Sequence, residues 1–138
     1  MEQFLGKWVE INEDMETKRK FMETLAFPKE VIDKRMSNTG FLETVKDGDL
    51  FKMTTGFVGD PAYNKSYHFK MNETFSDKDF FGQKFTLVCK VEGNKWYDKL
   101  TESYNQAEIE NVREVMGDKM VVTTTCNGKS LVSNFKRG

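Results

Sequence analysis

The sequence predicts an all-β protein, an antiparallel up-and-down barrel of about ten strands with a helix-turn-helix insert after the first strand. Two patterns predict this fold. Short alternating segments are separated by turn pairs such as Asp47-Gly48 and Asn127-Gly128, and one stretch, residues 14–36, has helical spacing and no turn pairs. A chain of 138 residues suits one compact domain, which we expect to cover 1–138.

The first expected strand is FLGKWVEI, residues 4–11, and the others follow from about Thr39. Runs such as LFKMTTGF, SYHFKM, KFTLVCKV and KMVVTTTC alternate in hydrophobicity, and the turn pairs between them are typical of an antiparallel meander. So many consecutive hairpins usually close on themselves, because closure removes exposed strand edges.

The insert is expected to contain two helices. Pro28 marks the break between them, since proline disfavours helix at the residue before it and suits the first turn of a new helix. The apolar residues that follow helical spacing are Met15, Phe21, Met22 and Leu25 before the break and Val31, Ile32 and Met36 after it.

The segment IENVREV, residues 109–115, places a charge on an apolar face. In an extended strand, Arg113 lies on the same side as Ile109 and Val115, while the glutamates lie on the other side. An unpaired buried charge costs several kcal/mol, so Arg113 needs a partner. The partner is either a ligand or a structural counterion within the fold.

Composition excludes several classes of function. The 21 basic and 22 acidic residues give a net charge of -1, which argues against nucleic-acid binding. The chain shows neither a membrane-spanning run nor a secretory signal, which predicts a cytosolic protein in which Cys89 and Cys126 stay reduced. His68, the single histidine, falls on a polar face. We therefore expect no catalytic residues, metal site or cofactor.

Together these features resemble the intracellular lipid-binding proteins, the family of fatty-acid-binding and cellular retinoid-binding proteins. The most specific matches are FLGKW at residues 4–8, VRE at 112–114 with GDK at 117–119, and the register that links the EGNK turn at 92–95 with Phe69, Phe75 and Phe135. The resemblance implies a ten-stranded barrel of two near-orthogonal sheets, a helical lid and one apolar ligand inside. It also implies a monomer.

The resemblance implies that Arg113 binds the ligand headgroup, with Thr124 and Ser133 as hydroxyl partners. The family usually has an arginine and a tyrosine two apart in the last strand, where this chain has Ser133-Asn134-Phe135. A neutral headgroup such as an acyl amide is therefore an alternative to a fatty acid. The predicted ligand-binding residues are Arg113, Thr124, Ser133, Phe135, Cys126, Val122, Phe69, Met71, Leu87 and Trp96.

The helical lid carries two further sets of predicted residues. The portal set is Phe21, Met22, Leu25, Val31, Ile32, Phe57 and Tyr63, in which either Phe57 or Tyr63 is the portal aromatic residue. The basic set is Lys18, Arg19, Lys20, Lys29, Lys34 and Arg35, which forms a solvated face or contacts anionic membranes or nuclear import machinery.

The predicted function is intracellular binding and transport of a long-chain fatty acid or related acyl lipid. The alternative is a lipid-dependent signalling shuttle, which would carry the lipid to the nucleus or a membrane through the basic lid.

Overall fold

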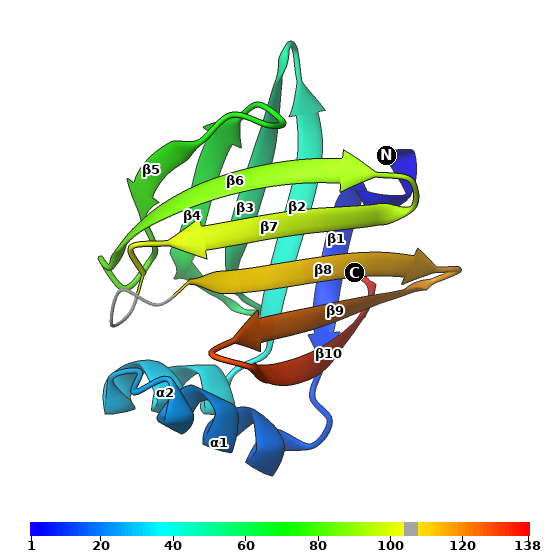
Figure 1. Ribbon diagram of the computed structural model, residues 1–138. Coiled ribbons are helices and arrows are strands. Elements are labelled where there is room, and N and C mark those ends of the chain that lie inside the picture. Colours follow the sequence, from blue (N-terminus) through cyan, green and yellow to red (C-terminus); the bar gives the residue numbers. More distant parts are fainter. Residues whose placement is uncertain (104–107) are drawn as a thin grey trace.

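The computed structural model describes residues 1–103 and 108–138. After a short 3-10 turn at Glu2–Phe4, the chain forms β1 (Gly6–Ile11) and two helices, α1 (Met15–Thr24) and α2 (Lys29–Ser37). Nine more strands follow (Figure 1): β2 (Gly40–Asp47), β3 (Leu50–Phe57), β4 (Asp60–Phe69), β5 (Phe75–Lys78), β6 (Lys84–Glu92), β7 (Lys95–Thr101), β8 (Ile109–Met116), β9 (Lys119–Cys126) and β10 (Lys129–Arg137). This order confirms the predicted fold class.

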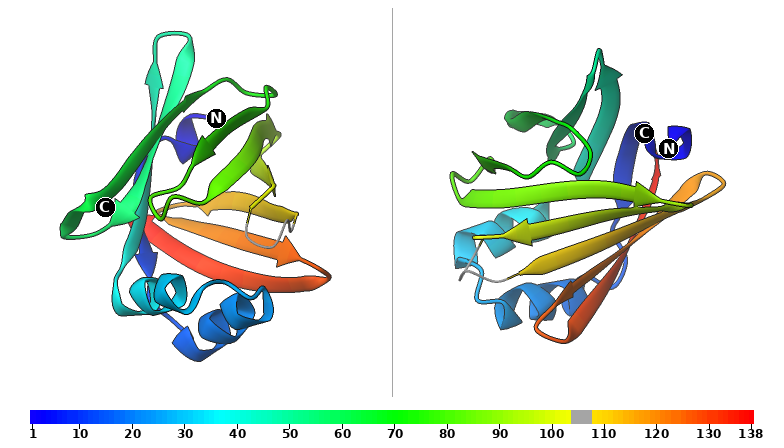
Figure 2. Two further views of the ribbon diagram at one scale, coloured as in Figure 1. Left: turned by 90° about the vertical axis from the view of Figure 1, so that its left-hand side faces the viewer. Right: turned by 45° about the horizontal axis from the view of Figure 1, so that its top comes forward.

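The strands form one antiparallel sheet in the order β4-β3-β2-β1-β10-β9-β8-β7-β6-β5. β1 pairs with both β2 and β10, so the first and last strands of the chain are neighbours in the middle of the sheet. The sheet curls into a nearly closed barrel whose two edges are β4 and β5 (Figure 2). Side chains bridge this seam. The Tyr67 ring lies 5.3 Å from Phe85, and its hydroxyl donates to the Lys78 carbonyl at 3.3 Å.

Tight turns set the register of the hairpins. At the β9–β10 turn, Asn127 and Gly128 both have positive φ, 52° and 76°, as a type I′ turn requires. This turn makes Cys126 the partner of Lys129 and, further along, Val122 the partner of Ser133. The turn pairs recognised in the sequence therefore fix which side chains face the interior.

The two helices lie side by side across one end of the barrel (Figures 1 and 2). A carboxylate oxygen of Asp14 accepts the Thr17 backbone N–H at 3.4 Å and caps α1, and Pro28 immediately precedes α2 as predicted. Their apolar residues Met22, Val31 and Ile32 are buried against the barrel. Among the described residues, no helix has both the length and the apolar character needed to cross a bilayer.

The most deeply buried part of the core lies around Trp8 and Trp96. Trp8 and Trp96 are each 0% exposed, and the Phe4 ring packs edge-on at 5.7 Å from Trp96. The Trp8 Nε1 group donates to the Phe4 carbonyl at 3.1 Å, so its one polar atom is satisfied. The barrel interior therefore has a packed half around Trp8 and Trp96 and a lid half beneath α1 and α2.

Candidate ligand-binding site

Arg113 lies inside the barrel, as the alternation along β8 predicts. The residue is 5% exposed, and Ile109 on the same row is also buried. Its cross-strand partners are Trp96 on β7 and Val122 on β9, which places the guanidinium in the packed half. The sequence thus positions a permanent charge among apolar side chains.

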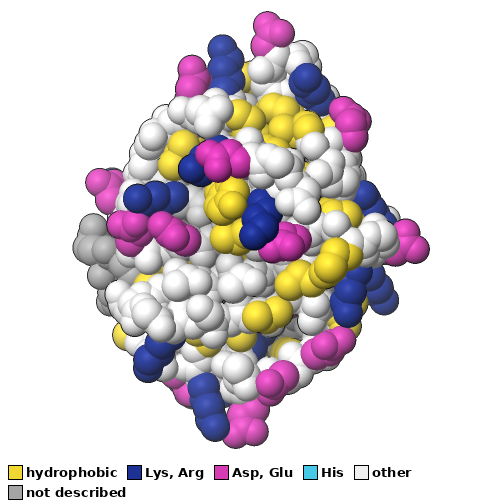
Figure 3. All heavy atoms as spheres, turned by 45° about the vertical axis from the view of Figure 1, so that its right-hand side comes forward, with side chains coloured by type: hydrophobic (Ala, Val, Ile, Leu, Met, Phe, Trp, Pro, Cys, Tyr) yellow, Lys and Arg dark blue, Asp and Glu magenta, His cyan; other side chains and the backbone are white. Residues whose placement is uncertain are grey.

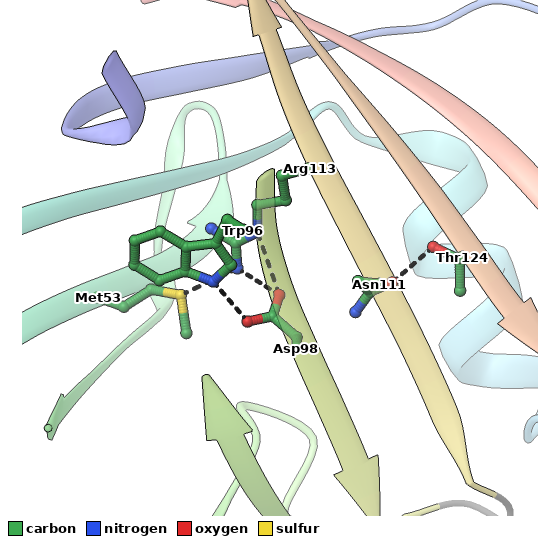
Figure 4. Close-up of polar contacts among 6 residues, drawn as sticks. All are labelled: Met53, Trp96, Asp98, Asn111, Arg113 and Thr124. Carbon is green, nitrogen blue, oxygen red and sulfur yellow. Dashed lines mark hydrogen bonds and ion pairs between the residues drawn. The ribbon is translucent and has the colours of Figure 1, made fainter. Parts of the chain in front are cut away.

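Asp98 of β7 is the counterion of Arg113 (Figure 4). The carboxylate oxygen Oδ2 accepts from Arg113 Nη2 at 2.7 Å and from Nε at 3.1 Å, while Oδ1 accepts from Trp96 Nε1 at 2.7 Å. Asp98 is 4% exposed, and the Arg113 guanidinium also stacks on the Trp96 ring at 4.9 Å. The fold itself therefore compensates both buried charges.

Cys89 completes the surroundings of this ion pair. It is the cross-strand partner of Asp98 and is fully buried. Burial, and to a smaller extent the Asp98 carboxylate, raise the pKa of the Cys89 thiol, so the thiol stays protonated. Cys89 is consequently a small apolar core residue with a weak donor beside a carboxylate.

No hydrogen bond among the described residues links Arg113, Thr124 and Ser133, so the predicted three-residue headgroup site stays a prediction. The Thr124 hydroxyl donates to Asn111 Oδ1 at 2.7 Å (Figure 4), and Ser133 lines a separate hollow between β10 and the segment joining β1 to α1. Arg113 instead donates its hydrogen bonds to Asp98. The sequence contained the signal, because Trp96, Asp98 and Leu100 alternate on one strand face.

A cavity of about 340 Å³ lies in the lid half of the barrel. Aromatic and aliphatic side chains make up most of its wall: Phe27, Phe41, Leu42, Met53, Phe57, Tyr67, Phe80, Phe85, Leu87, Leu100, Ile109 and Phe135. The polar and charged lining residues are Thr55, Ser103, Glu10, Lys18, Arg35 and Asp79. A mostly apolar cavity with few polar groups is typical of small-molecule sites.

Of the predicted ligand-binding residues, the cavity wall includes Leu87 and Phe135. The packed core takes Phe69, Trp96 and Val122, with Met71 against it. Cys126 belongs to a second cluster with Leu25 and Ile109 beneath α1. The register implied by the family resemblance predicted which side chains point inward, but not which of them line the cavity. Inward side chains fill one half of this barrel and leave space in the other.

An aromatic cluster lies under α2, consisting of Phe57, Tyr63, Phe80 and Phe81. Phe57 lines the cavity, while Tyr63 packs against Phe57 at 5.8 Å and does not line it. Phe80 and Phe81 were not predicted as site residues, because they lie in the turn between the short strand β5 and β6. Phe21 and Leu25 pack near Ile109, where α1 covers the barrel.

Most of the predicted basic set has acidic partners. Lys18 pairs with Glu10, Arg19 with Asp33, Lys20 with Glu16 and Lys34 with Asp60. Figure 3 shows positive and negative side chains interspersed over the face that it presents. The shuttle hypothesis stays a prediction, since no described contact relates cavity occupancy to exposure of these side chains.

Comparison with known proteins was made by sequence and by structure. No family model matches the chain. A fatty acid-binding protein of Lepidoglyphus destructor is 29% identical over 98 residues, covering 70% of each chain. An intestinal fatty acid-binding protein of Sus scrofa is 27% identical over 137 residues, covering 97% of this chain and 98% of that one.

Solved structures share the architecture. A Schistosoma mansoni fatty acid binding protein in complex with arachidonic acid superposes with a TM-score of 0.84 at 26% identity, covering 100% of this chain and 98% of that one. An Echinococcus granulosus fatty-acid-binding protein superposes with the same TM-score of 0.84 at 18% identity, covering 99% and 98%. Strand order, helix placement and these full-length matches agree: the chain has the fold of the fatty acid-binding proteins.

Proposed function

We propose that this protein binds one long-chain fatty acid or related acyl lipid in the barrel cavity and carries it through the cytosol. The observation that supports this most strongly is the apolar cavity of about 340 Å³ beneath the two helices. Relatives that match over most of the chain are named fatty acid-binding proteins, and one solved neighbour holds arachidonic acid. We propose a carrier and not an enzyme.

Burial of the acyl tail supplies most of the affinity. Each buried methylene contributes about 0.8 kcal/mol, so a chain of sixteen carbons gains about 12 kcal/mol before the costs of ordering are subtracted. A charge-assisted hydrogen bond adds about 1.5 to 3 kcal/mol. The aromatic wall therefore sets affinity, and the polar lining residues set the orientation of the ligand.

Arg113 is a poor candidate for holding a ligand carboxylate in this chain. Its guanidinium already donates to Asp98 through Nη2 and Nε. A second carboxylate beside Asp98 would add a like charge in a buried environment, which is unfavourable. This arrangement leaves fatty acids, fatty amides and fatty alcohols as candidate ligands, distinguished by other groups on the cavity wall.

The test is to identify what the protein carries. Native mass spectrometry of the purified chain is expected to show one added acyl lipid per chain, and extraction would identify it. After delipidation, palmitic acid or palmitamide should bind with one-to-one saturation. A chain that carries nothing and binds neither of these ligands nor retinol would contradict the proposal.

A matched pair of variants ties binding to this cavity. Leu87→Trp adds a large side chain where Leu87 lines the cavity, and should reduce palmitate binding strongly. The control is Val132→Trp on β10, because Val132 is 59% exposed and does not line the cavity. Equal binding by both variants would place the ligand elsewhere.

A further inference from the structure

We propose that Arg35 of α2 binds the carboxylate of the ligand, so that the headgroup lies at the helical lid and the tail points toward the packed half. This inference rests on the proposed function and names the headgroup site within the same cavity. It reverses the orientation expected from the family resemblance, in which the headgroup lies deep in the barrel at Arg113.

The first argument is that Arg35 has unused hydrogen-bonding capacity. Its side chain lines the cavity, and its Nε atom is buried without a hydrogen-bond partner. Among residues 1–103 and 108–138, no carboxylate lies within ion-pair distance of its guanidinium. A buried donor without a partner is unfavourable, and an incoming carboxylate would satisfy it.

The second argument is that the other cations near the cavity are already paired. Lys18 lines the same cavity and forms an ion pair with Glu10, and Arg113 forms one with Asp98. A ligand carboxylate at either of these cations would compete with a protein carboxylate. Arg35 offers a positive charge on the cavity wall without that competition.

The third argument is that the neighbouring rings orient the guanidinium. The carbon atom Cζ of Arg35 lies 5.5 Å from the Phe80 ring centroid and 5.6 Å from that of Phe81. Stacking on aromatic rings stabilises a guanidinium while leaving its N–H edge available, which is the edge that binds a carboxylate. The aromatic cluster under α2 therefore supports Arg35 as a binding group.

Hydroxyl groups on the same wall suit a carboxylate headgroup. Thr55 and Ser103 both line the cavity that Arg35 enters, whereas the hydroxyl of Tyr67, which also lines it, already donates to the Lys78 carbonyl. Asp79 also lines it, and its Oδ1 atom accepts the backbone N–H groups of Phe81 and Gln83, each at 2.9 Å. These hydrogen bonds hold the Asp79 carboxylate in its own turn.

The experiment compares a charged and an uncharged ligand of equal length. Palmitic acid and methyl palmitate are titrated into delipidated wild-type protein and the Arg35→Gln variant. Loss of a charge-assisted pair should weaken the binding of palmitic acid by about 10- to 100-fold. The dissociation constant of methyl palmitate should stay within about threefold of its wild-type value. Arg35→Lys keeps the charge but loses the paired N–H donors of the guanidinium. Its affinity for palmitic acid should therefore lie between those of wild type and Arg35→Gln.

Lys29→Gln is the matched control, because Lys29 begins the same helix, is exposed and does not line the cavity. It should bind both ligands like wild type. Carbon-13 NMR of carboxyl-labelled palmitate gives a second readout: the bound carboxyl should titrate at a higher pH in Arg35→Gln than in wild type.

The outcomes separate the two proposals. If wild-type protein binds neither palmitic acid nor methyl palmitate, the proposed function fails. If it binds palmitic acid and Arg35→Gln binds it equally well, the headgroup inference is overturned while the function stands. If palmitamide binds as tightly as palmitic acid and both are insensitive to Arg35→Gln, the head is recognised without this charge, which also overturns the inference.

Discussion

Two arginines in this barrel have opposite electrostatic situations. Arg113 lies in the packed half and donates two hydrogen bonds to Asp98, whereas Arg35 enters the cavity in the lid half with a buried Nε that has no partner. The comparison teaches that an inward arginine is not in itself a ligand site. What decides its role is whether the fold supplies the counterion.

The two halves also differ in packing. In the packed half, Trp8, Trp96 and Cys89 are each 0% exposed, and the guanidinium of Arg113 also donates to the Met53 sulfur at 3.6 Å. Around Arg35, aromatic rings border open space. Substitutions in the packed half should therefore change mainly stability, and substitutions in the lid half mainly binding and local opening.

The largest effect is expected for Asp98→Asn. The change leaves Arg113 as a buried charge without its counterion, which should lower the free energy of unfolding by about 3 to 5 kcal/mol. Urea unfolding followed by tryptophan fluorescence measures the loss. Glu114→Gln is the control, because that carboxylate on β8 is 42% exposed and pairs with Lys95 at 3.5 Å, which predicts a change within about 1 kcal/mol. Equal effects of the two variants would contradict the assigned role of Asp98.

The comparison is sharpened by replacing both partners. Arg113→Met combined with Asp98→Leu removes both charges at similar volume, so the double variant should be more stable than Asp98→Asn by about 2 kcal/mol or more. The remaining cost comes from Trp96 Nε1, which loses its acceptor at 2.7 Å. The same urea unfolding measures the loss of unfolding free energy in each single variant and in the double variant. If the loss in the double variant equals the sum of the two single losses, the ion pair does not act as a unit.

In the lid half, Lys34→Gln should have a small effect on global stability. The Lys34–Asp60 pair is partly exposed, with side-chain exposures of 26% and 33%, and such pairs contribute about 0 to 1 kcal/mol. Because the pair ties α2 to the start of β4, its loss should speed amide hydrogen exchange at residues 58–60. Unchanged exchange at these residues would show that the contact does not hold the lid.

The smallest effect concerns pH. Burial raises the pKa of the Cys89 thiol and of the Tyr67 hydroxyl in the folded state. Above about pH 9 the unfolded chain loses these protons while the folded protein keeps them, so the free energy of unfolding should fall as pH rises. Urea unfolding from about pH 7 to about pH 10 tests this. The slope should be shallower in Cys89→Ala, and a flat profile for wild type would contradict the assignment.

Much of the fold could be predicted from local patterns. Alternation along β8 placed Arg113 inside, and Pro28 marked the boundary between the helices. A structural counterion was one of the two alternatives for Arg113, and alternation along β7, which puts Asp98 on the face of Trp96, indicates which residue it is. The cavity position could not be predicted, since it depends on how aromatic side chains from distant strands fill the packed half. Arg35 was grouped with surface charges because helical spacing does not show where a long side chain ends.

The most direct measurement is the palmitate dissociation constant of the Arg113→Met, Asp98→Leu double variant in the absence of denaturant. Cooperative urea unfolding first verifies that this variant is folded. If Arg113 serves the fold, the dissociation constant should stay within about threefold of wild type. A loss of about tenfold or more in a folded double variant would contradict this division of roles and return the headgroup to the packed half.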